Sequence, residues 1–294
     1  MNHNIHASKD LNDINKKSTQ NIFFNPDVPN KHIYKNMRNL RVTKLSIKSD
    51  KLNYSGSCRI VQLSDLHKKS FGTDNIDLIN AVKSLKPDMI FITGDMVSRD
   101  VVNLSDFKHL ISELLKICPV YYCLGNHEKD TEKINPDIYN QMISFLSESD
   151  IHLLDNKTEK MTINKIAIKI SGITLPTKCY KNNGKYKNLH KITAREISQM
   201  IGICDDSFNI LLAHNPVFFD TYAEYGADLI FSGHVHGGCV RLPLLGGILS
   251  PERKFFPKYT SGIYKKNNSS MIVSRGLGKF RIFNPPEIIF LELY

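Results

Sequence analysis

The sequence predicts an α/β protein in which a mainly parallel half, built of alternating strands and helices, precedes a strand-rich half. Apolar runs of strand length alternate with segments of helix length up to residue 154. Beyond that point apolar strands follow one another with a single expected helix between them. The 294 residues can form one large domain, and 41% hydrophobic and 23% charged residues are typical of globular proteins.

The first half of the chain predicts parallel βαβ units. Apolar residues alternate from Val42 to Ile47, and a continuous apolar run from Met89 to Thr93 follows Pro87. The expected elements are strands at 42–47, 59–63, 89–93, 120–124 and 151–154 and helices at 75–85, 106–117 and 136–147. Since helices of this length separate the strands, the pattern favours a parallel sheet.

The second half predicts mostly strands. The expected elements are a β-hairpin at 160–173, a helix at 194–201, buried strands at 209–212 and 228–231, and a strand-rich end from 260 to 293. The second half of the chain is therefore expected to be β-rich, in contrast to the βαβ units of the first half.

The N-terminal segment, Met1 to Leu40, is polar and holds nine asparagines. It lacks the apolar stretch of a signal peptide, and no apolar run reaches the roughly 18 residues of a membrane span. We therefore expect a flexible leader at 1–40 and a folded domain at 41–294. The protein is expected in the cytoplasm, and a peripheral association with the membrane stays open.

The formal net charge of +10 is unevenly distributed. Residues 178–195 contain six Lys or Arg and no acid, and residues 250–281 contain eight against one acid. Such clusters favour a polyanionic partner, which includes a phosphorylated small molecule, nucleic acid or anionic lipid head groups. A solvated basic face without a partner is the alternative interpretation.

Five short segments place potential metal ligands directly after apolar strands. They are Ser64-Asp65-Leu66-His67, Gly94-Asp95, Gly125-Asn126-His127-Glu128, Leu212-Ala213-His214-Asn215-Pro216 and Gly233-His234-Val235-His236-Gly237-Gly238. Functional groups of open α/β sheets gather at the carboxyl ends of strands, so these segments can meet at one site. Each segment alone is an ordinary turn, whereas the two imidazoles of Gly-His-Val-His-Gly-Gly have few structural uses.

The residue types suit a two-metal site. Carboxylate, amide and imidazole ligands favour Mn, Fe, Co or Zn, and a carboxylate such as that of Asp95 can bridge two cations. Two metals roughly 3.5–4 Å apart can hold a bridging hydroxide that attacks a phosphate ester. The expected cofactors are therefore two divalent metal ions per chain.

The order of the five segments resembles the calcineurin-like metallophosphoesterases, whose motifs run D-x-H, G-D, G-N-H-D/E, H and G-H-x-H. The resemblance covers 41–294 and implies that this range is the catalytic domain, with a four-layer α/β/β/α sandwich. It also implies two ligand sets and a role for His127 near the leaving-group oxygen, as general acid or transition-state stabiliser. The implied ligands are Asp65, His67 and His236 for one metal, Asn126, His214 and His234 for the other, and Asp95 as the bridge.

The C-terminal part is similar to the bacterial YkuE-like branch, which includes phosphodiesterases and hydrolases of UDP-diacylglucosamine. The residues that carry this similarity are 237–243, 274–278 and 284–288. Arg241, Arg275 and Arg281 are candidates for binding substrate phosphate, with structural ion pairs as the alternative. Many family members place an Asp that orients the catalytic His three positions after the bridging Asp, and this chain has Ser98 there.

The leading hypothesis is a binuclear phosphohydrolase that acts on a phosphodiester or a pyrophosphate. A phosphomonoesterase acting on nucleotides or phosphoproteins is the second. The third is a non-catalytic protein that binds nucleic acid or anionic lipid, against which the intact ligand set argues. The expected partner is a phosphate-ester substrate, with lipid- or nucleotide-linked substrates both open, and no obligate protein partner is implied.

Overall fold

The computed structural model describes residues 40–294 apart from 53–56, 164–165, 183, 239, 243–245, 251–254 and 279–281. The expected leader therefore lies outside the described residues, save for Leu40.

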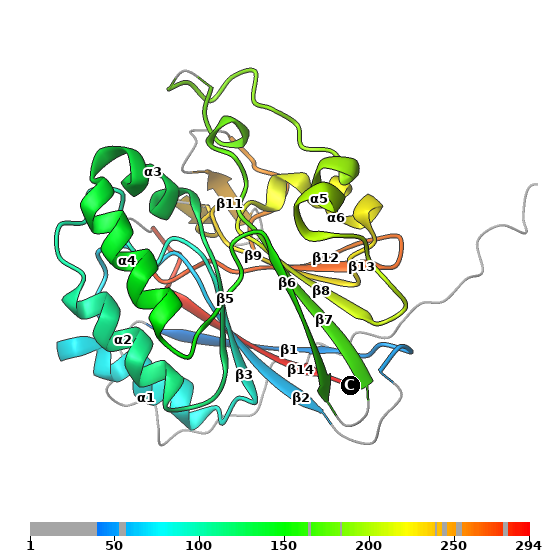
Figure 1. The fold of residues 1–294 in the computed structure, drawn as a ribbon, viewed down its shortest axis with the longest axis horizontal. Coiled ribbons are helices and arrows are strands. Elements are labelled where there is room, and N and C mark those ends of the chain that lie inside the picture. Colours follow the sequence, from blue (N-terminus) through cyan, green and yellow to red (C-terminus); the bar gives the residue numbers. More distant parts are fainter. Residues whose placement is uncertain are drawn as a thin grey trace, which may run out of the picture.

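Two mixed six-stranded sheets form the centre of the molecule (Figure 1). In spatial order the first contains β1 (Arg41–Ile47), β14 (Glu287–Leu293), β2 (Cys58–Leu63), β3 (Met89–Thr93), β4 (Val120–Cys123) and β5 (His152–Leu153). The second contains β12 (Gly262–Lys266), β13 (Ser269–Val273), β9 (Leu229–Ser232), β8 (Phe208–Ala213), β7 (Ile166–Ile173) and β6 (Lys157–Ile163). A separate antiparallel pair is formed by β10 (Val240–Leu242) and β11 (Gly246–Leu249).

Strands β2, β3, β4 and β5 are parallel to one another, as are β7, β8 and β9. Strand β14 pairs parallel with β1 and antiparallel with β2, so the last strand of the chain lies inside the first sheet.

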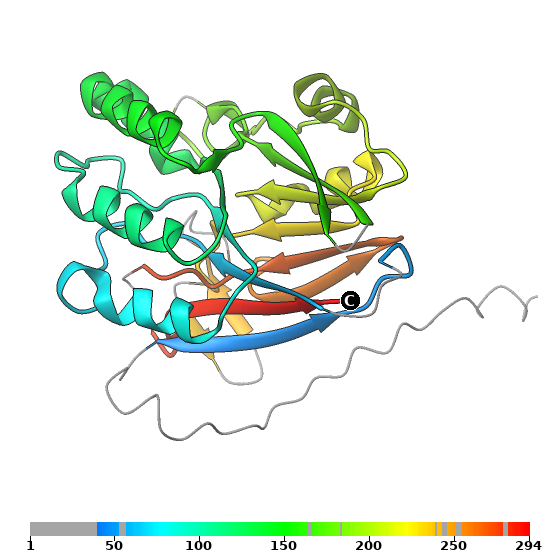
Figure 2. The ribbon, with the colours of Figure 1, turned by 60° about the horizontal axis from the view of Figure 1, so that its bottom comes forward.

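Helices cover the outer face of each sheet (Figure 2). The first sheet carries α1 (Ile76–Ser84), α2 (Ser105–Leu115) and α4 (Pro136–Glu148), and α3 (Asn126–Ile134) precedes α4. The second carries α5 (Ala194–Ile201) and α6 (Phe219–Tyr225). Short 3-10 helices lie at Thr73–Asn75, Thr177–Cys179 and Pro216–Phe218.

The side chains of each strand alternate between two cores. In β2, Val61 and Leu63 pack against the helices, whereas Ile60 packs between the two sheets. In β8, Leu212 lies between the sheets and Leu211 packs against α5 and α6. Three apolar cores separate four layers, which confirms the expected α/β/β/α sandwich.

Local sequence signals explain the helix bounds. At α5, Thr193 Oγ1 accepts a hydrogen bond from the amide of Glu196, whose carboxylate accepts one from the amide of Thr193. At α4, Oδ1 of Asn135 accepts a hydrogen bond from the amide of Ile138, and Pro136 lies in the first turn. The expected helix at 194–201 matches α5, but the sequence patterns did not predict α3, α6 or the position of β14.

Within the part of the chain that the structure describes, none of the helices combines the length and apolar character that a membrane crossing needs.

Candidate metal centre

The predicted ligands come from loops after five parallel strands. Asp65 and His67 follow β2, Asp95 follows β3, Asn126 follows β4, His214 follows β8, and His234 and His236 follow β9. Because the two sheets pack face to face, the carboxyl ends of these strands meet at one edge. The structure brings six of the seven together there, as two adjoining groups, and Asn126 begins α3 directly after Gly125, which abuts Asp95.

The first group contains Asp65, His67 and His236. Nε2 of His67 lies 3.2 Å from Nε2 of His236, which lies 3.3 Å from Oδ1 of Asp65. Two imidazole nitrogens and a carboxylate oxygen thus converge, and a cation is the partner that all three can share. Asp65 is buried, and both its carboxylate oxygens accept from the amide of His234.

The second group contains Asp95, His214 and His234. His214 donates from Nδ1 to the carbonyl of Thr93 at 2.6 Å, so Nε2, 3.0 Å from Oδ2 of Asp95, is the ring nitrogen that could bind an ion. Nε2 of His214 also lies 3.9 Å from Oδ1 of Asp65, so the two groups adjoin.

Asn126 supports the fit to a metal. Its Oδ1 is buried and has no hydrogen-bond partner among the described residues, which is costly for an amide oxygen unless a cation binds it. Nδ1 of His67 is another buried atom without a partner in the described chain. The donor set of imidazole, carboxylate and amide oxygen therefore fits divalent ions of the Mn, Fe, Co and Zn type.

Backbone strain concentrates at the same residues. Five of the seven predicted ligands have φ between 53° and 69°, a region that residues other than glycine rarely adopt; they are Asp65, His67, Asp95, His234 and His236. Conformations of this kind cost of order 1 kcal/mol each and cluster at functional sites. Two glycines allow the loops to touch, because a Cβ at Gly125 would lie 2.2 Å from Oδ1 of Asp95 and one at Gly233 would lie 2.0 Å from Oγ of Ser64.

Glu128 fixes the loops after β3 and β4 to each other. Its buried carboxylate accepts hydrogen bonds from the amides of Asp95, Met96 and Gly125 and from the hydroxyl of Tyr122, at 2.8–2.9 Å. Burial and the charge of Asp95 raise the pKa of Glu128 to about 7, whereas the hydrogen bond from Tyr122 acts in the opposite direction. Four donors to one carboxylate make Glu128 the structural support of the centre.

His127 lies beside the two groups and is held by Arg99. The backbone amide of Arg99 is 3.2 Å from Nδ1 of His127, and Nη2 of the Arg99 guanidinium is 2.8 Å from Nε2 of His127. Arg99 is in turn paired with Asp130 through Nη1 at 3.1 Å. Burial lowers the pKa of His127 to about 3, against the opposing charge of Asp95, so the imidazole is neutral in this arrangement.

The three candidate arginines differ in their surroundings. Arg275 is largely buried, with its Nε 3.5 Å from Oε1 of Glu287 and its amide donating to the same carboxylate. Arg241 donates from Nη1 to the carbonyl of Gly237 at 3.3 Å, directly after the histidine motif. Arg281 lies outside the described residues.

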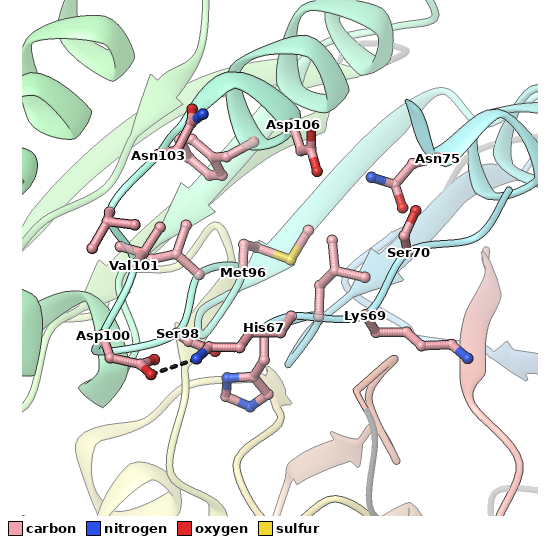
Figure 3. A pocket seen from close by; sticks show the side chains of 15 residues that line it. His67, Lys69, Ser70, Asn75, Met96, Ser98, Asp100, Val101, Asn103 and Asp106 are labelled. Atoms are coloured by element: carbon pink, nitrogen blue, oxygen red, sulfur yellow. Dashed lines mark hydrogen bonds and ion pairs between the residues drawn. The ribbon is translucent and has the colours of Figure 1, made fainter. Parts of the chain in front are cut away.

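A cavity of about 340 Å³ opens beside His67 (Figure 3). Figure 3 shows His67 at one end and Asp106 at the other. Leu66, Met96, Val97, Val101 and Phe107 give the wall its apolar part. Lys68 and Asp100 form an ion pair at its edge, beside the loop that carries Ser98.

Three residues at the centre were not singled out from the sequence. Glu128 carried a signal, since a Glu three residues after Gly125 at the start of a helix is a capping position. No pattern in the sequence pointed to Arg99 or Tyr180. The buried ring of Tyr180 lies 5.1 Å from that of His234 and comes from the loop between β7 and α5.

Known proteins share this organisation. A family model described as calcineurin-like phosphoesterase matches residues 58–238. The chain is 26% identical to the UDP-2,3-diacylglucosamine pyrophosphatase LpxG of Chlamydia muridarum, over 86% of this chain and 89% of that protein. It is 27% identical to the phosphodiesterase YaeI of Escherichia coli, over 80% and 82%, and 27% identical to the metallophosphoesterase YkuE of Bacillus subtilis, over 83% and 80%.

Proposed function

The chain belongs to the calcineurin-like phosphoesterase family and is a hydrolase of phosphate esters, and we propose that its substrate is a phosphodiester or a pyrophosphate, cleaved with two divalent metal ions. The observation that carries the proposal is the pair of adjoining ligand groups, Asp65, His67 and His236 beside Asp95, His214 and His234. Two relatives are named as a pyrophosphatase and a phosphodiesterase, in accord with this substrate class. The catalytic domain in this proposal spans 41–294, because β1 and β14 belong to the first sheet.

The first group and the second group would each hold one ion, with Asn126 completing the second. Asp95 would contact both, because its Oδ2 faces His214 while its carboxylate also belongs to the cluster with His67 and His127. When bound, two ions supply a nucleophile by lowering the pKa of water and polarise the phosphoryl oxygens.

His127 would face the leaving group. Its ring centroid lies 4.4 Å from that of His67, and its side chain retains 20% exposure, so it borders the open side of the centre. Its amide donates to Oδ1 of Asp95 at 2.7 Å, which couples its position to the proposed bridging carboxylate. In this position the imidazole can stabilise charge that develops on the leaving oxygen.

The cavity beside His67 supports a substrate with organic groups on both sides of the phosphorus. A phosphomonoester leaves one side of the phosphate bare, whereas a diester or pyrophosphate can place a second group in this space. The apolar wall formed by Met96, Val97 and Val101 suits a group with an apolar part. Arg241, whose Nη1 donates to the carbonyl of Gly237 directly after the histidine motif, would bind a further phosphate oxygen.

The test compares bis-p-nitrophenyl phosphate with p-nitrophenyl phosphate, using protein stripped of metal by a chelator and then supplied with Mn, Fe, Co, Zn or Mg singly. We expect restored cleavage that favours the diester, together with two ions per chain by elemental analysis. Equal or greater cleavage of the monoester would support the phosphomonoesterase instead. Turnover that does not respond to any metal would contradict the proposal.

A further inference from the structure

Two cations that share one carboxylate lie beside His127. Asp130 follows His127 by about one turn of α3. Its Oδ2 is 3.1 Å from Nη1 of Arg99 and 3.9 Å from Nζ of Lys181. Among the described residues, Asp130 is the only carboxylate that is paired with either cation. Two positive charges therefore meet one negative charge, which leaves an excess of one positive charge next to the histidine.

Lys181 belongs to a segment that also contacts the candidate metal centre. The preceding residue, Tyr180, places its buried ring 5.1 Å from the ring of His234. At the same time Nζ of Lys181 reaches Asp130, which shares Arg99 with His127. Residues 180 and 181 thereby connect the second ligand group with the face of α3 that carries His127.

The ammonium of Lys181 has unused hydrogen-bond donors. Its separation of 3.9 Å from Asp130 is too long for a hydrogen bond, and Nζ forms none with the described part of the chain. It also lies 5.6 Å from the centroid of the Tyr186 ring. The side chain is only 23% exposed, and a charge withdrawn from water to this extent is costly unless an anion compensates it. An anionic group of the substrate would supply that compensation.

We propose that Lys181 and Arg99 bind a second phosphate of the substrate, which departs as the leaving group, so that the preferred substrate is a pyrophosphate. This inference rests on the proposed hydrolysis and on the place of His127 at the leaving group. In a phosphodiester the leaving group is an alcohol, which brings no charge to this side. In a pyrophosphate it is a phosphate, whose anionic oxygens match the excess positive charge beside His127.

The bond changes follow from this placement. An oxygen from water adds to one phosphorus, and the bond between that phosphorus and the bridging oxygen breaks. The electron pair of that bond stays on the bridging oxygen, which leaves with the second phosphate. The protons of the water are shared between the two product phosphates and the solvent. Lys181 and Arg99 stabilise the negative charge that accumulates on the departing phosphate.

A single compound offers both kinds of leaving group to the protein. Bis(p-nitrophenyl) diphosphate carries one aryl group on each phosphorus. It can lose p-nitrophenolate at an outer bond, or it can be cleaved at the central P–O–P linkage into two molecules of p-nitrophenyl phosphate. We expect the full chain, with its metals restored, to cleave mainly the central linkage. Chromatography of the first products measures the ratio of central to outer cleavage.

Lys181→Met keeps the aliphatic stem of the side chain and removes its charge. We expect the ratio of central to outer cleavage to fall about tenfold or more in this variant. Lys181→Arg keeps the charge and should recover part of the ratio. The matched control is Lys185→Met, at an exposed lysine of the same loop, which should leave the ratio unchanged.

A binding measurement provides a readout without turnover. Diphenyl methylenediphosphonate has its two phosphorus atoms joined by carbon, so it cannot be cleaved at the centre. By calorimetry we expect Lys181→Met to bind this compound about tenfold more weakly, or worse, and Lys185→Met to bind it as the unchanged protein does.

An unchanged product ratio in Lys181→Met would overturn the inference and leave the proposed hydrolysis intact. Equal effects of Lys181→Met and Lys185→Met would overturn it as well, because they would reflect the overall charge of the loop. A protein that cleaves neither bond, but binds the methylene compound in a manner that depends on Lys181, would count against the proposed hydrolysis alone.

Discussion

Nη2 of Arg99 lies 2.8 Å from Nε2 of His127, while the amide of the same arginine faces Nδ1 at 3.2 Å. A neutral imidazole has one N–H and one lone pair, so only one of these donors can form a hydrogen bond at a time. Arg99, which follows Ser98, therefore holds His127 in place. In many family members an Asp at the position of Ser98 orients this histidine. Asp130 fixes the guanidinium in turn.

Replacing Arg99 should weaken the stabilisation of the leaving group. For Arg99→Ala we expect kcat to fall about ten- to a hundredfold, with KM and metal content nearly unchanged. The loss should be greater for diesters with a poor alkyl leaving group than for p-nitrophenyl esters, which need less stabilisation. Arg99→Lys keeps the charge without the second contact and should recover part of the rate. Equal losses of kcat for all leaving groups would show that Arg99 has a purely structural role. The control is Lys160→Ala, which removes an exposed ion pair with Asp205.

His127→Ala should remove turnover and keep the metals. We expect kcat for the diester to fall about 10²- to 10⁴-fold, while elemental analysis still finds two ions per chain. The reason is that His127 borders the open side of the centre and its imidazole is not assigned to either ion. Loss of metal together with activity would instead make His127 a ligand.

Asp95→Asn tests the bridging role. A neutral amide supplies one acceptor oxygen in place of two anionic ones. We therefore expect fewer than two ions per chain and a rate of diester hydrolysis that is at least about a hundredfold lower. Elemental analysis and diester hydrolysis on the same samples measure both effects. Two bound ions with normal turnover would be incompatible with a bridging Asp95.

Glu128→Gln should destabilise the fold around the centre. The amide NH2 of glutamine would face backbone N–H donors that now meet a carboxylate oxygen, so we expect the free energy of unfolding to fall by about 2–4 kcal/mol. Tyr122→Phe removes a single donor to the same carboxylate and should cost about 1 kcal/mol. Thermal unfolding of metal-free protein measures both variants. Equal melting temperatures for Glu128→Gln and the unchanged protein would show that the four contacts do not support the loops.

Filling the cavity should discriminate between substrates. Val101→Trp places a larger side chain in the space beside His67, and we expect KM for the diester to rise roughly three- to tenfold. KM for the phosphomonoester should hardly change, because a phosphomonoester has no second organic group that would enter the cavity. Ile203→Trp, at an exposed position outside the cavity, is the control. Parallel changes for both esters would show that the second group of the diester does not enter here.

The meeting of the candidate ligands at one edge could be predicted because the place of each is a local property of the sequence. Asp65, Asp95 and His214 each follow an apolar strand, and parallel strands end at a common edge whatever their order in the sheet. The strand order could not be predicted, since β14 enters between β1 and β2 through packing between distant parts of the chain. Arg99 was missed for the same reason, because its contact with His127 depends on how two loops pack.

The inserted β14 also determines when the molecule can be completed. While the protein is being synthesised, β2, β3 and β4 leave the ribosome long before residues 287–293, which must separate β1 from β2. Until then β2 offers a free edge, and apolar residues of the first sheet stay open to wrong pairing. A nascent chain therefore exposes this edge of β2 until residues 287–293 have emerged. Premature termination before Glu287 would leave all of the candidate metal ligands translated but the first sheet unfinished.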